Sequence, residues 1–394
     1  MMGESRVIKR LGDILIFDKR FNGIPRERQM TIAHFNHVSA EELKSLKLES
    51  GDVRLISTGL FDGYTTEEKA GHNLNRGEII TIPTGGVANI KYYNGAFVDS
   101  GNLIGVAGND SICLKYVFYG MTFKRDIINS FYRGVSIKHP YMPDICNIEL
   151  PIPSFREQQA IASELDCLTS VLDKRKQQLI ELDLLSQSVF SDMFGEDNEV
   201  LQRWPTSRLE EICLKIVDCP HSTPQKEKGP TKYPCIRTSE LKGGSISWDS
   251  MQYVSKQEYE SRIARLTPKA GDIVYGREGS FGDAVILPEG YFFCLGQRTM
   301  LFRANPECVN NVFLHRVLIS PIIFKQAKDN SVTSTVSHIN VKDIKRFLIP
   351  VPPKDKQLLF AQKIEAIEKQ KELIRRSIDE TSSLFNCRMS HWFN

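Results

Sequence analysis

Cationic and amide side chains in loops and at strand ends are the groups of this chain best suited to chemistry. A lysine on a loop suits contact with a phosphate, whereas arginine and glutamine can form two hydrogen bonds with the edge of a guanine or an adenine. The candidates for phosphate contact are Lys226, Lys228, Lys232 and the adjoining Tyr233, in a loop between Pro224 and Pro234. The candidates for base contact are Arg237, Arg277, Gln297 and Arg298. A solvated loop and salt bridges inside a domain would use the same residues, and the sequence leaves these alternatives open.

Further candidates occur in the first half of the chain and in one polar turn of the second half. In the first half they follow a glycine turn, Thr84-Gly85-Gly86, or lie on a helical stretch predicted to begin at residue 116. These residues are Lys91, Tyr92 and Tyr93, then Lys124, Arg125 and Arg133. In the second half, the polar turn contains Ser334, Thr335 and His338, whose side chains can contact the oxygens of a nucleic-acid backbone.

Residue patterns for catalysis are missing from the sequence. It has no Asn-Pro-Pro-aromatic motif for base methylation and no G-x-x-x-x-G-K-[ST] loop for nucleotide phosphates. It also lacks an H-E-x-x-H or C-x-x-C pair, and its eight histidines show no ligand spacing. We therefore expect no catalytic residue, no metal site and no cofactor in this chain.

Composition indicates an ordinary globular protein with room for two or three domains. The 394 residues are 25% charged and 41% hydrophobic, and the net charge is only +3, so a nucleic-acid surface would need locally concentrated cations. The nine cysteines are scattered and odd in number, which favours reduced thiols over a disulfide framework. The N-terminus lacks the apolar run of a signal peptide, and no apolar stretch is long enough to span a membrane. We expect a cytoplasmic protein without a membrane segment.

The elements that would position these groups are repeated along the chain. The motif Pro151-Ile152-Pro153 occurs again as Pro350-Val351-Pro352, and the same number of residues separates Gln158 from Gln357. Each Pro-x-Pro precedes a long predicted helix. The two globular segments also match each other: Gly77-Glu78-Ile79 corresponds to Gly271-Asp272-Ile273. A chain built as globule, helix, globule, helix is one protein with two equivalent modules. The predicted domains are 1–149, with a helix at 150–198, and 199–348, with a helix at 349–394.

Each predicted helix carries a heptad seam, a row of mainly apolar residues spaced four and three apart. The seam of the first helix is Ile161, Leu165, Leu168, Leu172, Arg175, Leu179, Leu182, Ser186, Val189 and Met193. The seam of the second is Phe360, Ile364, Ile367, Lys371, Ile374, Ile378, Thr381, Phe385, Arg388 and Trp392. Residues 156–192 have four basic and seven acidic side chains, whereas residues 354–388 have eight basic and six acidic ones. Opposite net charge favours pairing of the two helices with each other over self-association; two unrelated surface helices are the alternative.

Capping residues in the sequence indicate where the predicted helices begin and end. Ser154 and Glu157 fit a capping box at the start of the first helix, and Gly195 suits its C-terminal cap. In the second copy Pro353 replaces the serine, so the capping box is lost. Residues 196–207 are predicted to be a short linker.

The doubled arrangement, the Pro-x-Pro-x-x-x-x-x-Gln helix starts and the ending Asp192-Met193-Phe194-Gly195 resemble the specificity subunit of type I restriction–modification enzymes. The resemblance implies an α+β fold with two mixed α/β target-recognition domains in tandem. It further implies that each domain reads one half of a bipartite site in double-stranded DNA, and that the helices form an antiparallel coiled coil that sets the spacing. The implied partners are two methyltransferase subunits, which would bind S-adenosylmethionine, and restriction subunits. A non-catalytic protein–protein scaffold with two adaptor domains on a coiled coil is the rival interpretation.

Overall fold

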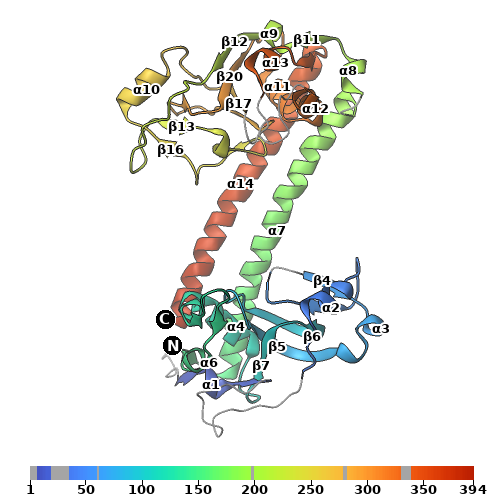
Figure 1. The fold of residues 1–394 in the computed structure, drawn as a ribbon, viewed down its shortest axis with the longest axis vertical. Helices are drawn as coiled ribbons and strands as arrows, with labels where there is room; N and C mark the ends of the chain where they lie inside the picture. Colours follow the sequence, from blue (N-terminus) through green and yellow to red (C-terminus); the bar gives the residue numbers. More distant parts are fainter. Residues whose placement is uncertain (1–6, 19–34, 60–61, 197–198, 278–281, 330–338) are drawn as a thin grey trace. The chain divides into compact units, whose positions relative to one another are not determined.

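The computed structural model describes residues 7–18, 35–59, 62–196, 199–277, 282–329 and 339–394 (Figure 1). They form two compact units, each a globular domain together with parts of two long helices. The first unit joins Met1–Lys176 with Arg375–Asn394, and the second is Gln177–Ile374. Each long helix therefore contributes one part to each unit.

The first unit is built on a six-stranded sheet in the order β2-β7-β5-β6-β3-β4. Its strands are β2 (Leu15–Phe17), β3 (Val53–Ile56), β4 (Asp62–Thr65), β5 (Asn75–Pro83), β6 (Lys91–Asp99) and β7 (Asn102–Ala107). The central strand β5 pairs antiparallel with both neighbours, with Ile79 opposite Tyr93 and Ile80 opposite Gly105. Ile80 and Ile82 are fully buried in the main core of this unit.

Helices and two small sheets complete the first unit. The short helices are α1 (Leu11–Ile14), α2 (Ala40–Ser45), α3 (Glu67–Ala70), α4 (Leu114–Phe123), α5 (Arg125–Ser130) and α6 (Met142–Cys146). The remaining strands are β1 (Val7–Arg10), β8 (Tyr132–Arg133), β9 (His139–Pro140) and β10 (Glu149–Ile152). Strand β1 pairs with β10, which ends within the first Pro-x-Pro at Ile152, so the start of the domain is tied to the start of its helix. Tyr116 of α4 donates a hydrogen bond to the Pro151 carbonyl at 2.6 Å and lies 5.0 Å from the Phe393 ring.

The second unit repeats four consecutive strands of the first-unit sheet, starting at its β2 edge. The order β12-β20-β17-β18 matches β2-β7-β5-β6. The bounds are β12 (Cys213–Asp218), β17 (Ile273–Gly276), β18 (Ala284–Ile286) and β20 (Thr299–Ala304). Strand β11 (Thr206–Arg208) pairs with β21 (Leu348–Pro350), as β1 pairs with β10. The sequence repeat is therefore a repeat of strand topology.

Beyond that shared frame the second unit has its own additions. A three-stranded sheet, β16-β13-β19, and a hairpin, β14-β15, take the place of the β3–β4 edge. The added strands are β13 (Pro234–Ile236), β14 (Leu241–Lys242), β15 (Ser245–Ile246), β16 (Gln252–Tyr253) and β19 (Cys294–Leu295). The short helices are α8 (Val200–Arg203), α9 (Leu209–Ile212), α10 (Lys256–Arg262), α11 (Asn311–Leu318), α12 (Pro321–Asp329) and α13 (Val341–Lys345).

The long helices are α7 (Phe155–Phe194) and α14 (Lys354–Phe393), green and red in Figure 1. Every residue of both predicted seams is buried or partly buried. In the first unit, Arg388 of α14 donates two hydrogen bonds to the Glu164 carboxylate of α7, the longer at 2.8 Å. In the second unit, the Phe360 ring of α14 packs against Phe190 of α7 at 5.7 Å. The two helices thus contact each other within each unit.

The helix ends follow the local signals in part. The Glu157 amide donates to the Ser154 hydroxyl at 3.4 Å, which is one half of the predicted capping box. Gly195 has φ +103° just after α7, a conformation that favours glycine.

Three local predictions were wrong. The helical stretch predicted over residues 116–131 is two helices, α4 and α5, separated at Lys124. Arg133 lies in strand β8 rather than on a helix, because β8 pairs with β9. The segment predicted as a linker contains α8 and the start of β11, and its Val200 is fully buried in the domain core.

Candidate nucleic-acid interface

The candidates of the second domain gather around the loop between β12 and β13, residues 219–233. Lys226, Lys228 and Lys232 are exposed on this loop, and in the part of the chain that the structure describes none of them has an ion-pair partner. The loop itself is anchored: the Thr231 hydroxyl donates to the Val254 carbonyl at 2.8 Å, and Tyr233 stacks on Tyr259 at 4.7 Å. An anchored backbone with unpaired ammonium groups matches the requirements of phosphate contact.

The turn between β19 and β20 presents two further candidates beside this loop. The Gln297 amide donates to the His221 carbonyl and to the Thr223 hydroxyl, both at 3.2 Å, so the turn and the loop are joined. The next residue, Arg298, is exposed and has φ +66°, and no other non-glycine residue in the described ranges has a positive φ. A bulky residue in this backbone region costs about 1–3 kcal/mol, and such strain concentrates at functional positions.

Two other arginine candidates are held by carboxylates. The Arg277 Nε lies 3.1 Å from Asp218 Oδ1, and only 6% of Arg277 is exposed. The Arg277 amide also donates to the Arg298 carbonyl at 3.0 Å, which supports the strained turn. The Arg237 guanidinium binds both oxygens of the buried Glu240, at 3.2 and 2.6 Å. These ion pairs fit a supporting role, and contact of either arginine with DNA stays a prediction.

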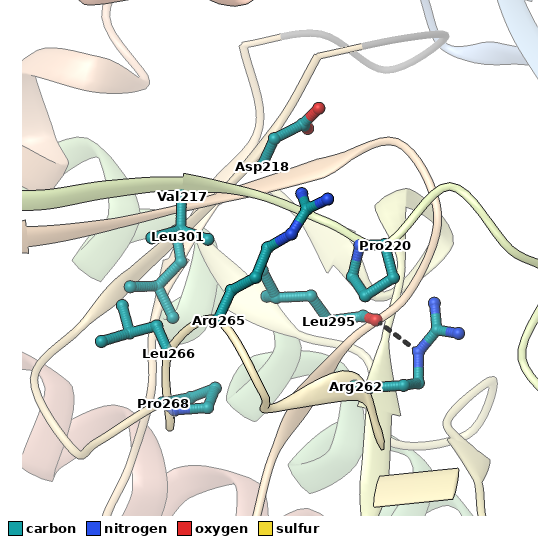
Figure 2. A pocket seen from close by; sticks show the side chains of 9 residues that line it. All are labelled: Val217, Asp218, Pro220, Arg262, Arg265, Leu266, Pro268, Leu295 and Leu301. Carbon is teal, nitrogen blue, oxygen red and sulfur yellow. Dashed lines mark hydrogen bonds between the residues drawn. The ribbon is translucent and has the colours of Figure 1, made fainter. Parts of the chain in front are cut away.

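Figure 2 shows two arginines at this site that the sequence analysis did not select. The buried Arg262 donates from Nε to the Leu295 carbonyl at 2.9 Å and from Nη1 to the Ser222 carbonyl at 3.3 Å, so it ties the loop to β19. Arg265 is exposed, and within the described residues it has no hydrogen-bond or ion-pair partner. The capping-box pattern of Ser255 and Glu258 could have revealed the helix that carries Arg262.

The hollow between these arginines is small. Its volume is about 10 Å³, and Asp218, Pro220, Arg262 and Arg265 are among the residues around it (Figure 2). This space holds one water at most, so it cannot enclose a base or a nucleotide.

The first-domain candidates on β6 are largely engaged with their own domain. Lys91 donates to the carbonyls of Ser57 and Gly59 at 2.6 and 2.8 Å. The Tyr92 hydroxyl donates to Glu78 at 2.7 Å, and burial is the main cause that raises the pKa of Tyr92. Tyr93 meets the Phe97 ring edge-on at 6.4 Å, and burial raises its pKa as well.

The other first-domain candidates lie near the β5–β6 turn or on the β8–β9 hairpin. Lys124 lies over the Phe123 ring at 5.5 Å, and Arg125 donates to the Ala88 carbonyl of the β5–β6 turn at 3.1 Å. Arg133 forms an ion pair with Asp144 at 2.7 Å, and 61% of its side chain is exposed. Ser334, Thr335 and His338 lie outside the described residues. The structure therefore assembles a cation surface most clearly in the second domain.

The described part of the chain contains neither a candidate metal centre nor a candidate membrane helix. Among the described residues, no group of three or more His, Cys, Asp or Glu side chains could hold a metal ion. No helix within the same ranges is both long and apolar enough to cross a bilayer.

Comparison with known proteins connects this architecture to one family. The family model of the type I restriction modification DNA specificity domain matches residues 35–182 and 202–381. The MjaVIII type I restriction enzyme specificity subunit of Methanocaldococcus jannaschii is 21% identical over 67% of this chain and 66% of its own length. The EcoBI specificity subunit of Escherichia coli is 19% identical over 69% of this chain and 62% of its own length. The chain thus spans just under two thirds of these relatives.

Solved structures agree in fold. The S subunit of a type I restriction–modification system from M. genitalium superposes with a TM-score of 0.63 at 14% identity, covering 98% of this chain and 96% of that one. A chain from a type I restriction–modification system solved to explain its assembly and conformational transition gives 0.50 at 15% identity, covering 99% and 98%. The family model covers most of the sequence and matches it twice, once in each half of the chain. The two units also share the order of four strands. The chain therefore belongs to the type I restriction modification DNA specificity domain family.

Proposed function

We propose that this chain is the DNA sequence-specificity subunit of a type I restriction–modification system. The observation that carries the proposal is the doubled module: two domains that share a four-strand order, each tied to a long helix through a strand that ends within a Pro-x-Pro. Each domain would read one half of a bipartite site. Linked readers bind two short sequences together with more affinity than either alone.

The two long helices would pair as an antiparallel coiled coil that fixes the distance between the readers. The contacts support an antiparallel pairing, because residues with higher numbers on α7 contact residues with lower numbers on α14. Glu164 contacts Arg388 in the first unit, and in the second Asp183 contacts Lys371 and Phe190 contacts Phe360. Both ion pairs place the acid on α7 and the base on α14, as the net charges of the two helices predict.

The chain would act within a complex and would itself catalyse nothing. Its partners would be double-stranded DNA, two methyltransferase subunits that carry S-adenosylmethionine, and restriction subunits. Work on DNA would place the complex in the cytoplasm. The absence of a methylation motif and of a phosphate-binding loop from the sequence supports this division of labour.

The decisive experiment is a genome-wide map of methylated bases. It compares a host that expresses the chain with a type I methyltransferase subunit against a host that expresses the methyltransferase alone. A split motif with a fixed gap that appears only with the chain is the expected result. Identical maps, with the methyltransferase shown to be active, would reject the proposal and favour the protein–protein scaffold.

Arg298→Gly tests the base-reading surface within that experiment. Glycine adopts φ +66° without strain, so we expect the melting temperature to be unchanged or slightly raised. Loss of a base-reading arginine should cost about 1–3 kcal/mol at one position of one half-site. The second half-site should be unaffected, because it would be read by the other domain.

The control is Lys228→Ala, on the exposed loop. A phosphate-contacting lysine should weaken all sequences alike and leave the motif unchanged. If Arg298→Gly keeps both the motif and the affinity, Arg298 does not read a base.

A further inference from the structure

We propose that Lys371 fixes the rotation of α14 relative to α7 and so restricts the complex to one gap length between the two half-sites. This inference rests on the proposed function. Lys371 stands in the seam of α14, where most other positions are apolar. Only 5% of Lys371 is exposed, so a charged group is buried at the helix contact. A single polar residue in a coiled-coil seam fixes the register of the helices at some cost in stability.

Two carboxylates satisfy the Lys371 ammonium. Its Nζ lies 2.5 Å from Asp183 Oδ1 on α7 and 2.5 Å from Glu368 Oε1, one turn earlier on α14. Burial alone would lower the pKa of Lys371, but the bonds to both carboxylates raise it above its ordinary value. The lysine therefore stays charged, and one of the two carboxylates that hold it lies on the other helix.

The sequence of α7 makes this bond specific for one register. If the helices slipped by one heptad, Lys371 would face Lys176 in one direction and Phe190 in the other, instead of Asp183. The first slip brings like charges together, and the second places an apolar ring beside the buried ammonium, which then keeps only Glu368 of its own helix. The Arg388–Glu164 pair is less selective, because the first slip would give Arg388 another acid, Glu157.

In the second unit, aromatic contacts hold the start of α14. In the second unit Phe360 lies in the aromatic core with Phe190 and Phe194, at 5.7 and 5.5 Å. Lys371 lies about three turns farther along the helix, near the boundary of the unit. It therefore acts on the stretch of helix that the aromatic core does not hold.

The rotation of this stretch of α14 affects the gap, because each base pair added to DNA changes both the distance and the angle between the half-sites. Adding one base pair moves a half-site by about 3.4 Å and turns it by about 35°. A complex could accept a gap one base pair longer or shorter only if the helix pair twisted or slid by a comparable amount. The Lys371–Asp183 bond opposes both motions.

Loss of the Lys371 ion pairs should not unfold the protein. The side chains of Asp183 and Glu368 are 62% and 45% exposed, so water solvates them when Lys371 is replaced. Methionine has a volume similar to that of lysine, and its apolar side chain suits the buried seam position. Lys371→Met is therefore the first variant to use, in the complete complex with methyltransferase and DNA.

The readout is methylation at each gap length in a library of bipartite sites with gaps from two base pairs shorter to two longer than the native one. Wild type should modify one gap, and Lys371→Met should raise modification at the neighbouring gaps about tenfold or more. The same change at the exposed Lys369 is the control and should keep one gap. A single gap in folded Lys371→Met, or loss of all methylation without a change in melting temperature, would overturn the proposal.

A second pair of variants removes one carboxylate each. Asp183→Ala deletes the bond between the helices and should relax the gap, whereas Glu368→Ala deletes the bond within α14 and should not. This contrast decides the matter if Lys371→Met does not fold, and equal behaviour of the two variants would count against the inference. If wild type itself shows no split motif, the proposed function fails rather than the role of Lys371.

Discussion

At the scale of single residues, Gln158 and Gln357 perform the same task in the two units. The Gln158 side-chain oxygen accepts the Cys113 amide at 2.9 Å, and its nitrogen donates to the Pro153 carbonyl at 2.9 Å. The Gln357 side chain accepts the Asn310 amide at 2.8 Å and donates to the Pro352 carbonyl at 2.7 Å. Both glutamines are almost fully buried. Each one ties the first turn of a long helix to the cap of the domain helix beside it, α4 or α11.

Gln357→Leu should release this tie. Leucine has a similar volume but leaves the Asn310 amide and the Pro352 carbonyl without their partner, at about 1–3 kcal/mol each. We expect a lower melting temperature and faster amide hydrogen exchange at the start of α11. Gln362→Leu, on the exposed face of α14, is the matched control. Equal effects of the two substitutions would show that the buried hydrogen bonds contribute nothing.

At the scale of elements, local signals predicted the repeat well and the domain interiors poorly. The long helices after each Pro-x-Pro and both seams depend on short patterns and are found as predicted. Gly271-Asp272 directly precedes β17, whereas Gly77-Glu78 lies inside β5 and not before it. The break between α4 and α5 has no proline or glycine to announce it. The break before α12 does have a signal, because Pro321 occupies its first position.

The candidate site was predictable only in part for a related reason. The loop lysines could be found because proline and glycine residues mark the loop in the sequence, and these lysines are exposed in the structure. The roles of Arg262 and Arg265 depend on where the turn after α10 lies against β12 and β19, which sequence distance does not reveal. Likewise, the sequence could not show that Arg277 is bound to Asp218.

Gly120 tests how tightly the elements of the first unit pack. A Cβ atom there would lie 2.8 Å from Leu150 Cδ1 on β10 and 3.1 Å from the Phe393 ring of α14. Gly120→Val should therefore lower the free energy of unfolding by about 1–3 kcal/mol through overpacking, although valine is the better helix former. Gly229→Val, where a Cβ meets open space, should change it by less than about 0.5 kcal/mol. Denaturant titration of both variants measures the difference; no loss in Gly120→Val would mean that Leu150 and Phe393 repack freely.

At the scale of the whole molecule, the repeat explains why one chain can carry two different reading surfaces. The shared four-stranded frame and the paired Pro-x-Pro strands are kept in both units, whereas the edge strands differ: β3 and β4 in one, the β13 sheet and the β14–β15 hairpin in the other. The frame attaches each domain to its helix in the same way. Under the proposed function, the variable edges and loops would choose the bases, and the helices would choose the distance between them.

This division predicts that distance can be changed without changing the bases read. Three heptads inserted between Lys176 and Gln177, and three more between Ile374 and Arg375, keep both seams continuous. At 1.5 Å per residue they lengthen the helix pair by about 31 Å, close to the 34–36 Å of one DNA turn. The methylation map should then show the same two half-sites with a gap about nine or ten base pairs longer.

Insertion into one helix only is the control, because the helices then differ in length and the Lys371–Asp183 and Arg388–Glu164 pairs cannot both form. We expect that variant to lose the split motif. One heptad in each helix should also be recognised poorly, since about 10 Å of added length corresponds to three base pairs and turns the second half-site by about 100°. An unchanged gap in the folded three-heptad variant would mean that the helices do not measure the distance, and that the two domains find their half-sites independently.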